Sequence, residues 1–314
     1  MCVTCGCSDD AETKITNSQT GEVVTINSHQ HEHTEDHTHI LPDGTVLSHS
    51  HHQEKQHSEH KHTLADGTII NHSHGEENST KIHRESSEIH AKMHGTTISL
   101  EQNILAKNNL IAAQNRGWFK GRNILALNLV SSPGAGKTTL LTRTINDLKN
   151  QLPIHVIEGD QETANDAEKI KATGCKVVQI NTGKGCHLEA EMVDKGLQQL
   201  NPPLDSVVMI ENVGNLVCPA LFDLGEKAKV VILSVTEGED KPIKYPYMFR
   251  ASDIMILTKI DLLPYVQFDV NRCIEYAKQV NPNIRIFQVS ATTGVGLEDW
   301  YQWLLKQVSV NILT

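Results

Sequence analysis

Apolar residues fall into short runs along the second part of this 314-residue chain, whereas the first part has few of them. From residue 124 onward the runs recur at intervals that leave room for amphipathic, helix-length segments. The runs predicted to be strands are residues 124–130, 154–157, 176–180, 206–210, 229–235, 254–257 and 284–289. Continuous apolar strands that alternate with helices predict an α/β fold, with a mostly parallel sheet flanked by helices on both faces.

A helix is predicted in front of the first of these strands. Residues 99–114 have helical periodicity, with a capping box at their start and Gly117 as the candidate stop. The folded domain is therefore expected to cover residues 95–314. Residues 9–94 have too few apolar side chains to offset the entropy lost on ordering, and they are predicted to be a largely disordered region.

A pattern of histidines occurs twice in that region, at residues 37–51 and 60–74. Each copy has a His-x-His pair, a short apolar strand, Asp-Gly, a second short strand and another His-x-His pair, which predicts a β-hairpin. A proline before the Asp-Gly of the first copy favours a three-residue loop, a register that places His37 opposite His49. We hypothesise that the histidines of each copy bind a metal ion. The alternative is an unstructured polyhistidine segment that buffers metal ions. The histidines concerned are His37, His39, His49 and His51 in the first copy and His60, His62, His72 and His74 in the second.

Charge and histidine content separate the same two parts of the chain. Residues 1–94 hold 15 acidic and 6 basic residues, which account for −9 of the net charge of −10, and 16 of the 18 histidines. An acidic balance without a basic stripe argues against nucleic acid as a partner. No apolar run reaches the roughly 18 residues of a membrane helix, and no secretory signal is recognisable. A cytoplasmic protein that does not bind membranes is therefore expected.

The chain begins MCVTCGCSDD, with Cys2, Cys5 and Cys7 close together. The alternatives for this cluster are a disulfide bond, half of a zinc site, a redox pair and a site that binds another metal ion. A reducing cytosol disfavours the disulfide, and the lack of a predicted scaffold around the motif disfavours a zinc finger. With the amine of Met1, the three thiolates can supply four donors from residues 1–8, a set that suits square-planar Ni²⁺.

The first predicted strand leads directly into SSPGAGKTT, residues 131–139. A strand, a glycine-rich loop and a helix in this order predict a P-loop, in which backbone N–H groups and a helix N-terminus face phosphates. Lys137 would reach the phosphates and Thr138 would coordinate Mg²⁺. Ser131 stands where the consensus has its first glycine, and an ordinary strand-to-helix turn is the alternative. The residues expected to contact the nucleotide are Gly134, Ala135, Gly136, Lys137, Thr138 and Thr139.

Leu257-Thr-Lys-Ile-Asp261 ends a later strand and is similar to the guanine-binding motif N/T-K-x-D. The Asp261 carboxylate would accept two hydrogen bonds from guanine, which adenine cannot supply, and the Lys259 stem would pack under the base. Ser290 and Ala291 match the loop that backs the guanine carbonyl. This order and spacing after a P-loop favour GTP over ATP.

Three further residues are expected to respond to the γ-phosphate. Asp160 and Glu211 each end or follow an apolar strand, where carboxylates hold Mg²⁺ and its waters, and Gly214 can offer a backbone N–H. With Lys137 and Thr138, these two acids form the predicted catalytic set for hydrolysis of GTP to GDP and phosphate. No arginine finger or water-positioning glutamine can be assigned, so slow intrinsic turnover is expected.

A second metal site is predicted from Gly185-Cys-His187 and Cys218-Pro219. Each segment follows a strand, so Cys186, His187 and Cys218 could converge on one ion beside the nucleotide. Individually a buried cysteine is more often a small hydrophobe and a lone histidine a filler of the core or surface. Three ligands leave such a site incomplete, as in labile sites or sites shared between subunits.

Together these motifs resemble the HypB family, the nickel-insertion GTPases of nickel–iron hydrogenase maturation. The resemblance implies a GTP-dependent homodimer that delivers Ni²⁺ to the hydrogenase large-subunit precursor, with HypA and the prolyl isomerase SlyD as partners. It also implies a tight nickel site at Cys2, Cys5 and Cys7, and Ni²⁺ or Zn²⁺ at Cys186, His187 and Cys218. The alternatives are urease-type nickel or zinc metallochaperone GTPases, a nickel storage protein, and a metal-responsive scaffold without turnover. Thr258 replaces the commoner asparagine of the guanine motif, which bears on nucleotide affinity.

Overall fold

In this computed structural model the described residues are 13–26, 36–40, 46–50, 59–63, 69–73, 82–161 and 165–312. The chain divides into two compact units: Met1–Ser28 together with Thr97–Thr314 form the first, and His29–Thr96 form the second. The first unit contains the predicted folded domain. Among the described residues, no helix combines the length and the apolar character needed to cross a membrane.

The seven predicted strands are all present in the first unit. They are β7 (Leu125–Ser131), β8 (Ile154–Asp160), β9 (Lys176–Asn181), β10 (Val207–Glu211), β11 (Ala228–Ser234), β12 (Ile254–Thr258) and β13 (Arg285–Gln288). All seven pair in parallel, in the spatial order β13-β12-β11-β7-β10-β8-β9. The predicted mostly parallel sheet is therefore confirmed.

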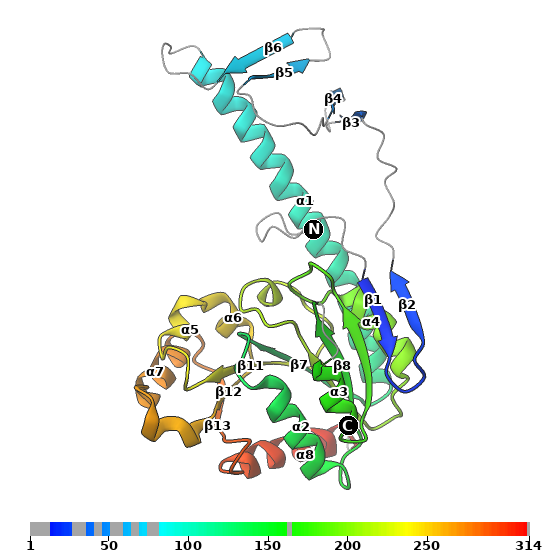
Figure 1. The fold of residues 1–314 in the computed structure, drawn as a ribbon, viewed down its shortest axis with the longest axis vertical. Helices are drawn as coiled ribbons and strands as arrows, with labels where there is room; N and C mark the ends of the chain where they lie inside the picture. The colour runs from blue at the N-terminus through cyan, green and yellow to red at the C-terminus, as the bar shows by residue number, and fades with distance from the viewer. Residues whose placement is uncertain are drawn as a thin grey trace. The chain divides into compact units, whose positions relative to one another are not determined.

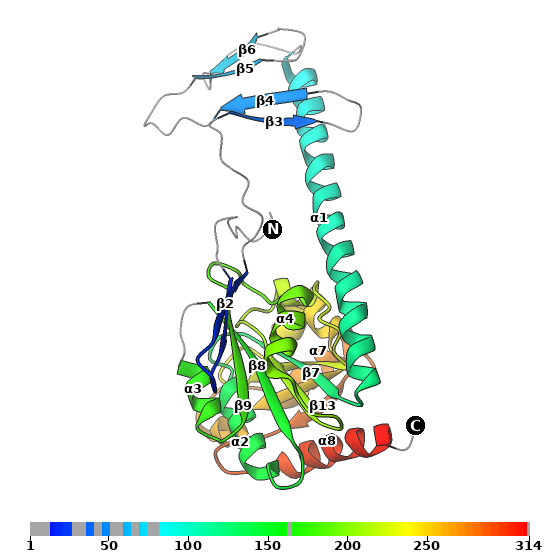
Figure 2. The ribbon, with the colours of Figure 1, turned by 90° about the vertical axis from the view of Figure 1, so that its right-hand side faces the viewer.

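Helices cover both faces of this sheet (Figures 1 and 2). One face packs on side chains of α2, α3 and α8, around Leu141, Ile170 and Trp300. The other packs on the end of α1 and on α4, and on α6 and α7 beyond them. The helices are α1 (Ile82–Gly121), α2 (Lys137–Leu148), α3 (Asn165–Lys171), α4 (Ala190–Leu200), α5 (Lys241–Lys244), α6 (Pro246–Ala251), α7 (Val270–Val280) and α8 (Leu297–Ile312), with short 3₁₀ segments η1 (Cys218–Ala220) and η2 (Ile260–Tyr265).

Two antiparallel strands that the sequence did not predict extend the sheet beyond β9. β1 (Thr13–Asn17) pairs with β9 and β2 (Val23–Ile26) pairs with β1, so this part of the predicted disordered region belongs to the folded unit. Ile15 is completely buried in the same apolar cluster as Ile180 and Leu188. One buried side chain and the hydrogen bonds of β9 order a segment whose own apolar content is low.

The helix α1 also differs from its prediction. It begins at Ile82, before the predicted cap at Ser99, and runs through Gly117 to Gly121. A glycine inside a helix costs about 1 kcal/mol relative to alanine. Phe119, which is 3% exposed in the cluster around Ile180, offsets that cost by its burial.

The second unit contains both predicted hairpins. β3 (Asp36–Ile40) pairs antiparallel with β4 (Val46–Ser50), with His37 opposite His49. β5 (Glu59–Thr63) pairs with β6 (Ile69–Ser73), with His60 opposite His72. The pairing is the register expected from the repeats, and metal binding by these histidines stays a prediction. His51 and His74 lie outside the described residues.

Candidate functional site

The P-loop connects the end of β7 to the start of α2 (Figure 1). Gly134 and Gly136 have φ angles of 76° and 93°, a left-handed conformation that side-chain-bearing residues rarely adopt. The two glycines permit the tight turn of the loop, which places backbone N–H groups beside the N-terminus of α2. Unpaired N–H groups and the helix dipole favour an anion at that position.

Lys137 and Thr138 begin α2 and face a carboxylate at the end of β10. Thr138 Oγ1 donates a 2.7 Å hydrogen bond to Glu211 Oε1, and Lys137 Nζ lies 3.7 Å from the same oxygen. Glu211 is 2% exposed; burial raises its pKa, while Lys137 and Thr138 oppose that shift. Among the described residues, none donates a hydrogen bond to its other oxygen, Oε2.

This donor set fits Mg²⁺. Hydroxyl and carboxylate oxygens are the hard ligands that Mg²⁺ takes beside phosphates and water. The buried Oε2 of Glu211, without a hydrogen-bond donor in the described part of the chain, is an oxygen that a cation would satisfy. Thr138 and Glu211 are thus the residues that would hold the ion.

Glu158 on β8 is a buried carboxyl group that sequence reasoning missed. It lies opposite Glu211 in the parallel register and is 2% exposed. Burial, and then the neighbouring carboxylates of Glu211 and Asp160, raise its pKa to about 9, so it is neutral at pH 7. The sequence signal was an acid directly after the apolar run 154–157.

Asp160 and Gly214 lie at the carboxyl edge of the sheet, where β8 and β10 end. The Asp160 backbone oxygen accepts a hydrogen bond from Thr182 N at 2.9 Å. A Cβ on Gly214 would lie 3.1 to 3.2 Å from atoms of Pro133 in the P-loop. Gly214 therefore allows the close approach of its backbone to the P-loop, and contact of either residue with the γ-phosphate stays a prediction.

The guanine motif packs directly on the P-loop. Thr258 Oγ1 donates a 2.7 Å hydrogen bond to the Ala135 oxygen, and Lys259 Nζ donates a 2.8 Å hydrogen bond to the Gly134 oxygen. Lys259 has a φ angle of 58°, in the left-handed region. Thr258, which stands where the commoner motif has asparagine, thus links the guanine motif to the P-loop.

Asp261 and the loop at Ser290 lie on adjoining segments. Asp261 is in the first turn of η2, where Ile260 N donates to Val289 O at 3.3 Å, directly before Ser290. Arg143 on α2 donates a 3.0 Å hydrogen bond to the Ala291 oxygen. Both predicted base-binding segments are therefore joined to each other and to the helix of the P-loop.

The predicted second metal site also comes together. Ligand atoms of Cys186, His187 and Cys218 all lie within 4.8 Å of one another, and among the described residues this is the group of three that could hold a metal ion. Cys186 and His187 follow β9, and Cys218 begins η1 after β10. His187 and Cys218 are 6% and 2% exposed, so the site is mostly shielded from solvent.

The surroundings of His187 favour an available lone pair. Burial lowers the pKa of His187 to about 4, so the imidazole is neutral at pH 7. Its Nε2 lies 3.8 Å from Glu189 Oε1, and its ring packs on Phe222 with centroids 3.9 Å apart. A neutral imidazole and two sulfur ligands form a soft donor set that suits Ni²⁺ or Zn²⁺ better than Mg²⁺.

The remaining cysteines divide into two groups. Cys175 and Cys273 are buried, and burial raises the pKa of each thiol to about 12, so each is a protonated thiol at pH 7. Cys2, Cys5 and Cys7 lie outside the described residues, and their metal-binding role stays a prediction.

Comparisons with known proteins agree on one family. The family described as CobW/HypB/UreG, nucleotide-binding domain, matches residues 125–288. The hydrogenase maturation factor HypB of Escherichia coli (strain K12) is 58% identical over 212 residues, which cover 67% of this chain and 72% of that protein. Crystal structures of HypB from Archaeoglobus fulgidus, and from Helicobacter pylori in complex with nickel, both align with a TM-score of 0.61 and 37% identity. They cover 65% of this chain, and 99% and 96% of those chains respectively.

Proposed function

The chain belongs to the HypB family of hydrogenase maturation factors within the CobW/HypB/UreG nucleotide-binding proteins, and on this premise we propose that it hydrolyses GTP to insert nickel into a hydrogenase. The acceptor is the precursor of the nickel–iron hydrogenase large subunit. The observation that carries the proposal is the convergence of Cys186, His187 and Cys218 within 4.8 Å, on segments that follow β9 and β10. β10 is adjacent to β7, the strand that leads into the P-loop.

Hydrolysis rests on electrostatic positioning by the P-loop residues. Lys137 and the N-terminus of α2 stabilise the charge that develops on the phosphates, and Gly214 offers its N–H to the γ-phosphate. Thr138 and Glu211 would hold Mg²⁺, which would supply positive charge beside the phosphates. Asp160 holds water near the bond that is broken. Glu158 is neutral, so it places no second negative charge beside Glu211.

Nickel is the cargo of the second site. Three ligands from one chain leave the coordination incomplete, and a homodimer that places two such sites face to face would supply the missing ligands. Zn²⁺ can occupy the same donors. HypA-type chaperones and SlyD-type prolyl isomerases are the proposed partners in nickel transfer.

The nucleotide and metal sites are linked by a short segment. Gly214 precedes Cys218 by four residues, and Asn215 Nδ2 between them donates a 3.3 Å hydrogen bond to the Cys186 oxygen. GTP that binds at Glu211 and Gly214 would therefore move the ligands of the metal, and nickel affinity would differ between the GTP and GDP states.

The N-terminal cysteines are proposed to serve the same site. Cys7 precedes Thr13 by six residues, which span at most about 20 Å when extended. In β1 the next residue, Lys14, pairs with Asn181 at the end of β9, and a turn closed by Gly185 N and Thr182 O leads from there to Cys186. The proposed nickel bound by Cys2, Cys5 and Cys7 can thus pass to Cys186 within one chain.

The histidine repeats are proposed to store nickel, and a deletion separates storage from delivery. Removal of residues 29–81 takes away both repeats and keeps β1, β2 and α1. In cells that depend on this chain, hydrogenase activity should stay within about twofold of normal at ample nickel and fall when nickel is scarce. The double variant Cys186→Ser/Cys218→Ser should lose activity when nickel is scarce in spite of an intact tail, whereas Cys273→Ala should not.

Other outcomes assign the roles differently. Full hydrogenase activity of the double variant at low nickel would show that the second metal site is not needed for nickel delivery. Loss of hydrogenase activity in the deletion variant at ample nickel would show that the histidine region does more than store metal. Hydrogenase activity is measured in cell extracts after growth at each nickel concentration.

A further inference from the structure

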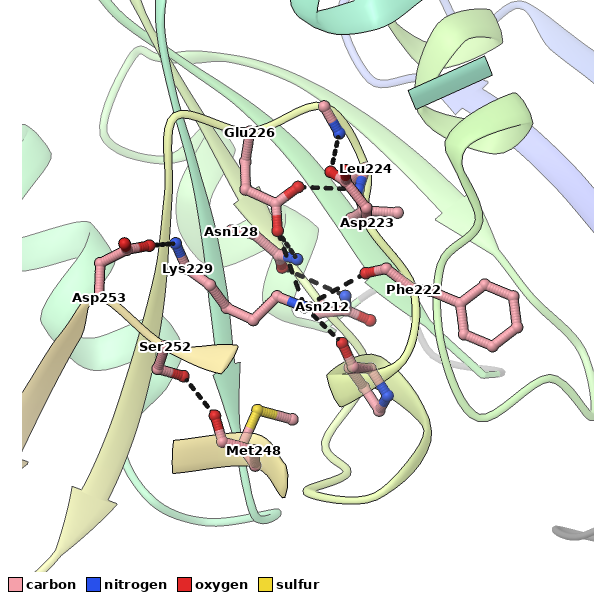
Figure 3. Close-up of polar contacts among 12 residues, drawn as sticks. Asn128, Asn212, Phe222, Asp223, Leu224, Glu226, Lys229, Met248, Ser252 and Asp253 are labelled. Atoms are coloured by element: carbon pink, nitrogen blue, oxygen red, sulfur yellow. Dashed lines mark hydrogen bonds and ion pairs between the residues drawn. The ribbon is translucent and has the colours of Figure 1, made fainter. Parts of the chain in front are cut away.

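Buried polar side chains on and beside neighbouring strands form a connected network (Figure 3). Asn212 directly follows β10, and its Oδ1 accepts a 3.1 Å hydrogen bond from the N–H of Leu188, next to His187. Its Nδ2 donates at 3.2 Å to Asn128 Oδ1 on β7. Asn128 Nδ2 in turn donates at 3.1 Å to Glu226 Oε1. The network therefore leads from the Cys186–His187 loop through the sheet.

Lys229 on β11 carries the same network to the other metal-binding segment. Its Nζ lies 3.8 Å from Glu226 Oε1 and donates to the backbone oxygens of Pro219 at 2.7 Å and Phe222 at 3.2 Å (Figure 3). Pro219 directly follows Cys218, and the Phe222 ring packs on His187. One ammonium group thus fixes the turn that positions Cys218.

These groups are unusually well buried for polar side chains. Asn128 is completely buried, and Asn212 and Lys229 are 1% and 6% exposed. A well-packed apolar cluster can replace a buried ion pair without loss of stability, so stability alone does not explain the network. Its two ends touch both metal-binding segments, and Asn212 is the residue after Glu211.

We propose that Asn128 and Glu226 are positioning residues of the metal site: they couple the Cys186–His187 loop to the Cys218 turn, so that both follow the nucleotide state sensed at Glu211. This proposal rests on the proposed nickel and GTP function. A network with fixed donors and acceptors transmits a shift of Asn212 to both loops, because Asn212 cannot move without breaking bonds at each step. Without it, the two cysteines would respond to nucleotide independently.

The test breaks one link of the network and then restores it. Glu226 Oε2 also accepts a 2.8 Å hydrogen bond from Leu224 N. Glu226→Gln leaves one acceptor oxygen for two donors, so its NH₂ group opposes either the Asn128 amide or the Leu224 N–H, and one hydrogen bond of the network is lost in either orientation. Asn128 cannot turn over to avoid this without opposing its donor to that of Asn212. Adding Asn128→Asp restores the link, because the new carboxylate accepts from both neighbouring amides. The full chain is used, with Cys2, Cys5 and Cys7 replaced by serine, and nickel affinity is titrated by thiolate-to-nickel charge-transfer absorption with GDP and with a non-hydrolysable GTP analogue.

We expect the ratio of the two nickel affinities to fall to within about twofold of one in Glu226→Gln and to recover in the double variant. Binding of the GTP analogue reports that each variant is folded. The matched control is Asn123 with Asp205, an amide-to-carboxylate pair of 2.6 Å in the connections that precede β7 and β10. Asp205→Asn, alone or with Asn123→Asp, should leave the ratio unchanged.

Three results would overturn the proposal: an unchanged ratio in Glu226→Gln, no recovery in the double variant, or an equal loss in the control. Absence of nucleotide dependence in the parent chain is a different result. It would contradict the proposed coupling of GTP to nickel itself, before any variant is considered.

Discussion

Replacing Lys137 with alanine should lower the rate of GTP hydrolysis at least about 100-fold. The lysine is the one P-loop side chain with a full positive charge, and its Nζ lies 3.7 Å from Glu211 Oε1, next to the hydroxyl of Thr138. Loss of a single preorganised group that stabilises developing charge lowers rates by about 10²–10³. Phosphate release from the full chain at saturating GTP and Mg²⁺ measures the effect.

A matched lysine keeps this test specific. Lys149 caps the other end of α2 and is exposed, so Lys149→Ala should hydrolyse GTP within about twofold of the unchanged chain. A Lys137→Ala rate within tenfold of normal would contradict the assignment of the P-loop as the hydrolytic centre. It would favour a scaffold that binds metal without turnover.

The change Asp261→Asn should weaken GTP binding by about 10²–10⁴-fold. We expect the carboxylate to accept two hydrogen bonds from guanine, and hydrogen bonds to charged groups contribute about 1.5–3 kcal/mol each. Xanthine carries an oxygen where guanine carries its amino group, so the asparagine amide should bind xanthosine triphosphate better than GTP. Equilibrium binding of the two nucleotides, measured by calorimetry in Mg²⁺, gives the comparison.

An exposed aspartate provides the control for this change. Asp299 lies on α8, remote in sequence from the guanine motif, and Asp299→Asn should bind GTP as the unchanged chain does. If Asp261→Asn kept its GTP affinity and its preference over xanthosine triphosphate, the base-binding assignment would be wrong. The P-loop assignment would stand, because it depends on other residues.

The sequence predicted the sheet and the metal group because both depend on local patterns and one topological rule. Seven apolar runs matched seven strands, and all of these strands except the edge strand β13 bury a nearly continuous row of side chains. Cys186, His187 and Cys218 follow two such strands, and parallel strands place their carboxyl ends at one edge. The location of these residues at one edge of the sheet was therefore predictable, whereas their approach to within 4.8 Å also depends on the strand order β10-β8-β9.

The features that sequence reasoning missed depend on contacts between distant segments. β1 is ordered by pairing with β9 and by one buried residue, Ile15, which no local apolar pattern marks. Glu158 lies opposite Glu211 because β10 lies beside β8. Asn128 meets Asn212 and Glu226 across 84 and 98 residues of sequence. Such partners are set by strand order, which hydrophobic periodicity does not specify.

The pairing of β1 also changes how the metal sites must be studied. Deletion of residues 1–94 would remove β1 and β2 together with the histidine repeats. The edge of β9 that pairs with β1 would then be exposed. Serine in place of Cys2, Cys5 and Cys7 silences the N-terminal thiolates and keeps the sheet intact. Histidine-bound nickel gives no thiolate charge transfer, so the absorption then reports Cys186 and Cys218.

We propose above all that GTP controls the nickel affinity of the site formed by Cys186, His187 and Cys218. In the full chain with serine at the three N-terminal cysteines, the nickel affinity of this site is titrated with GDP and with a non-hydrolysable GTP analogue. A coupling of ordinary size predicts affinities that differ by about 5- to 150-fold between the two states. Equal affinities in the two states would contradict the claim.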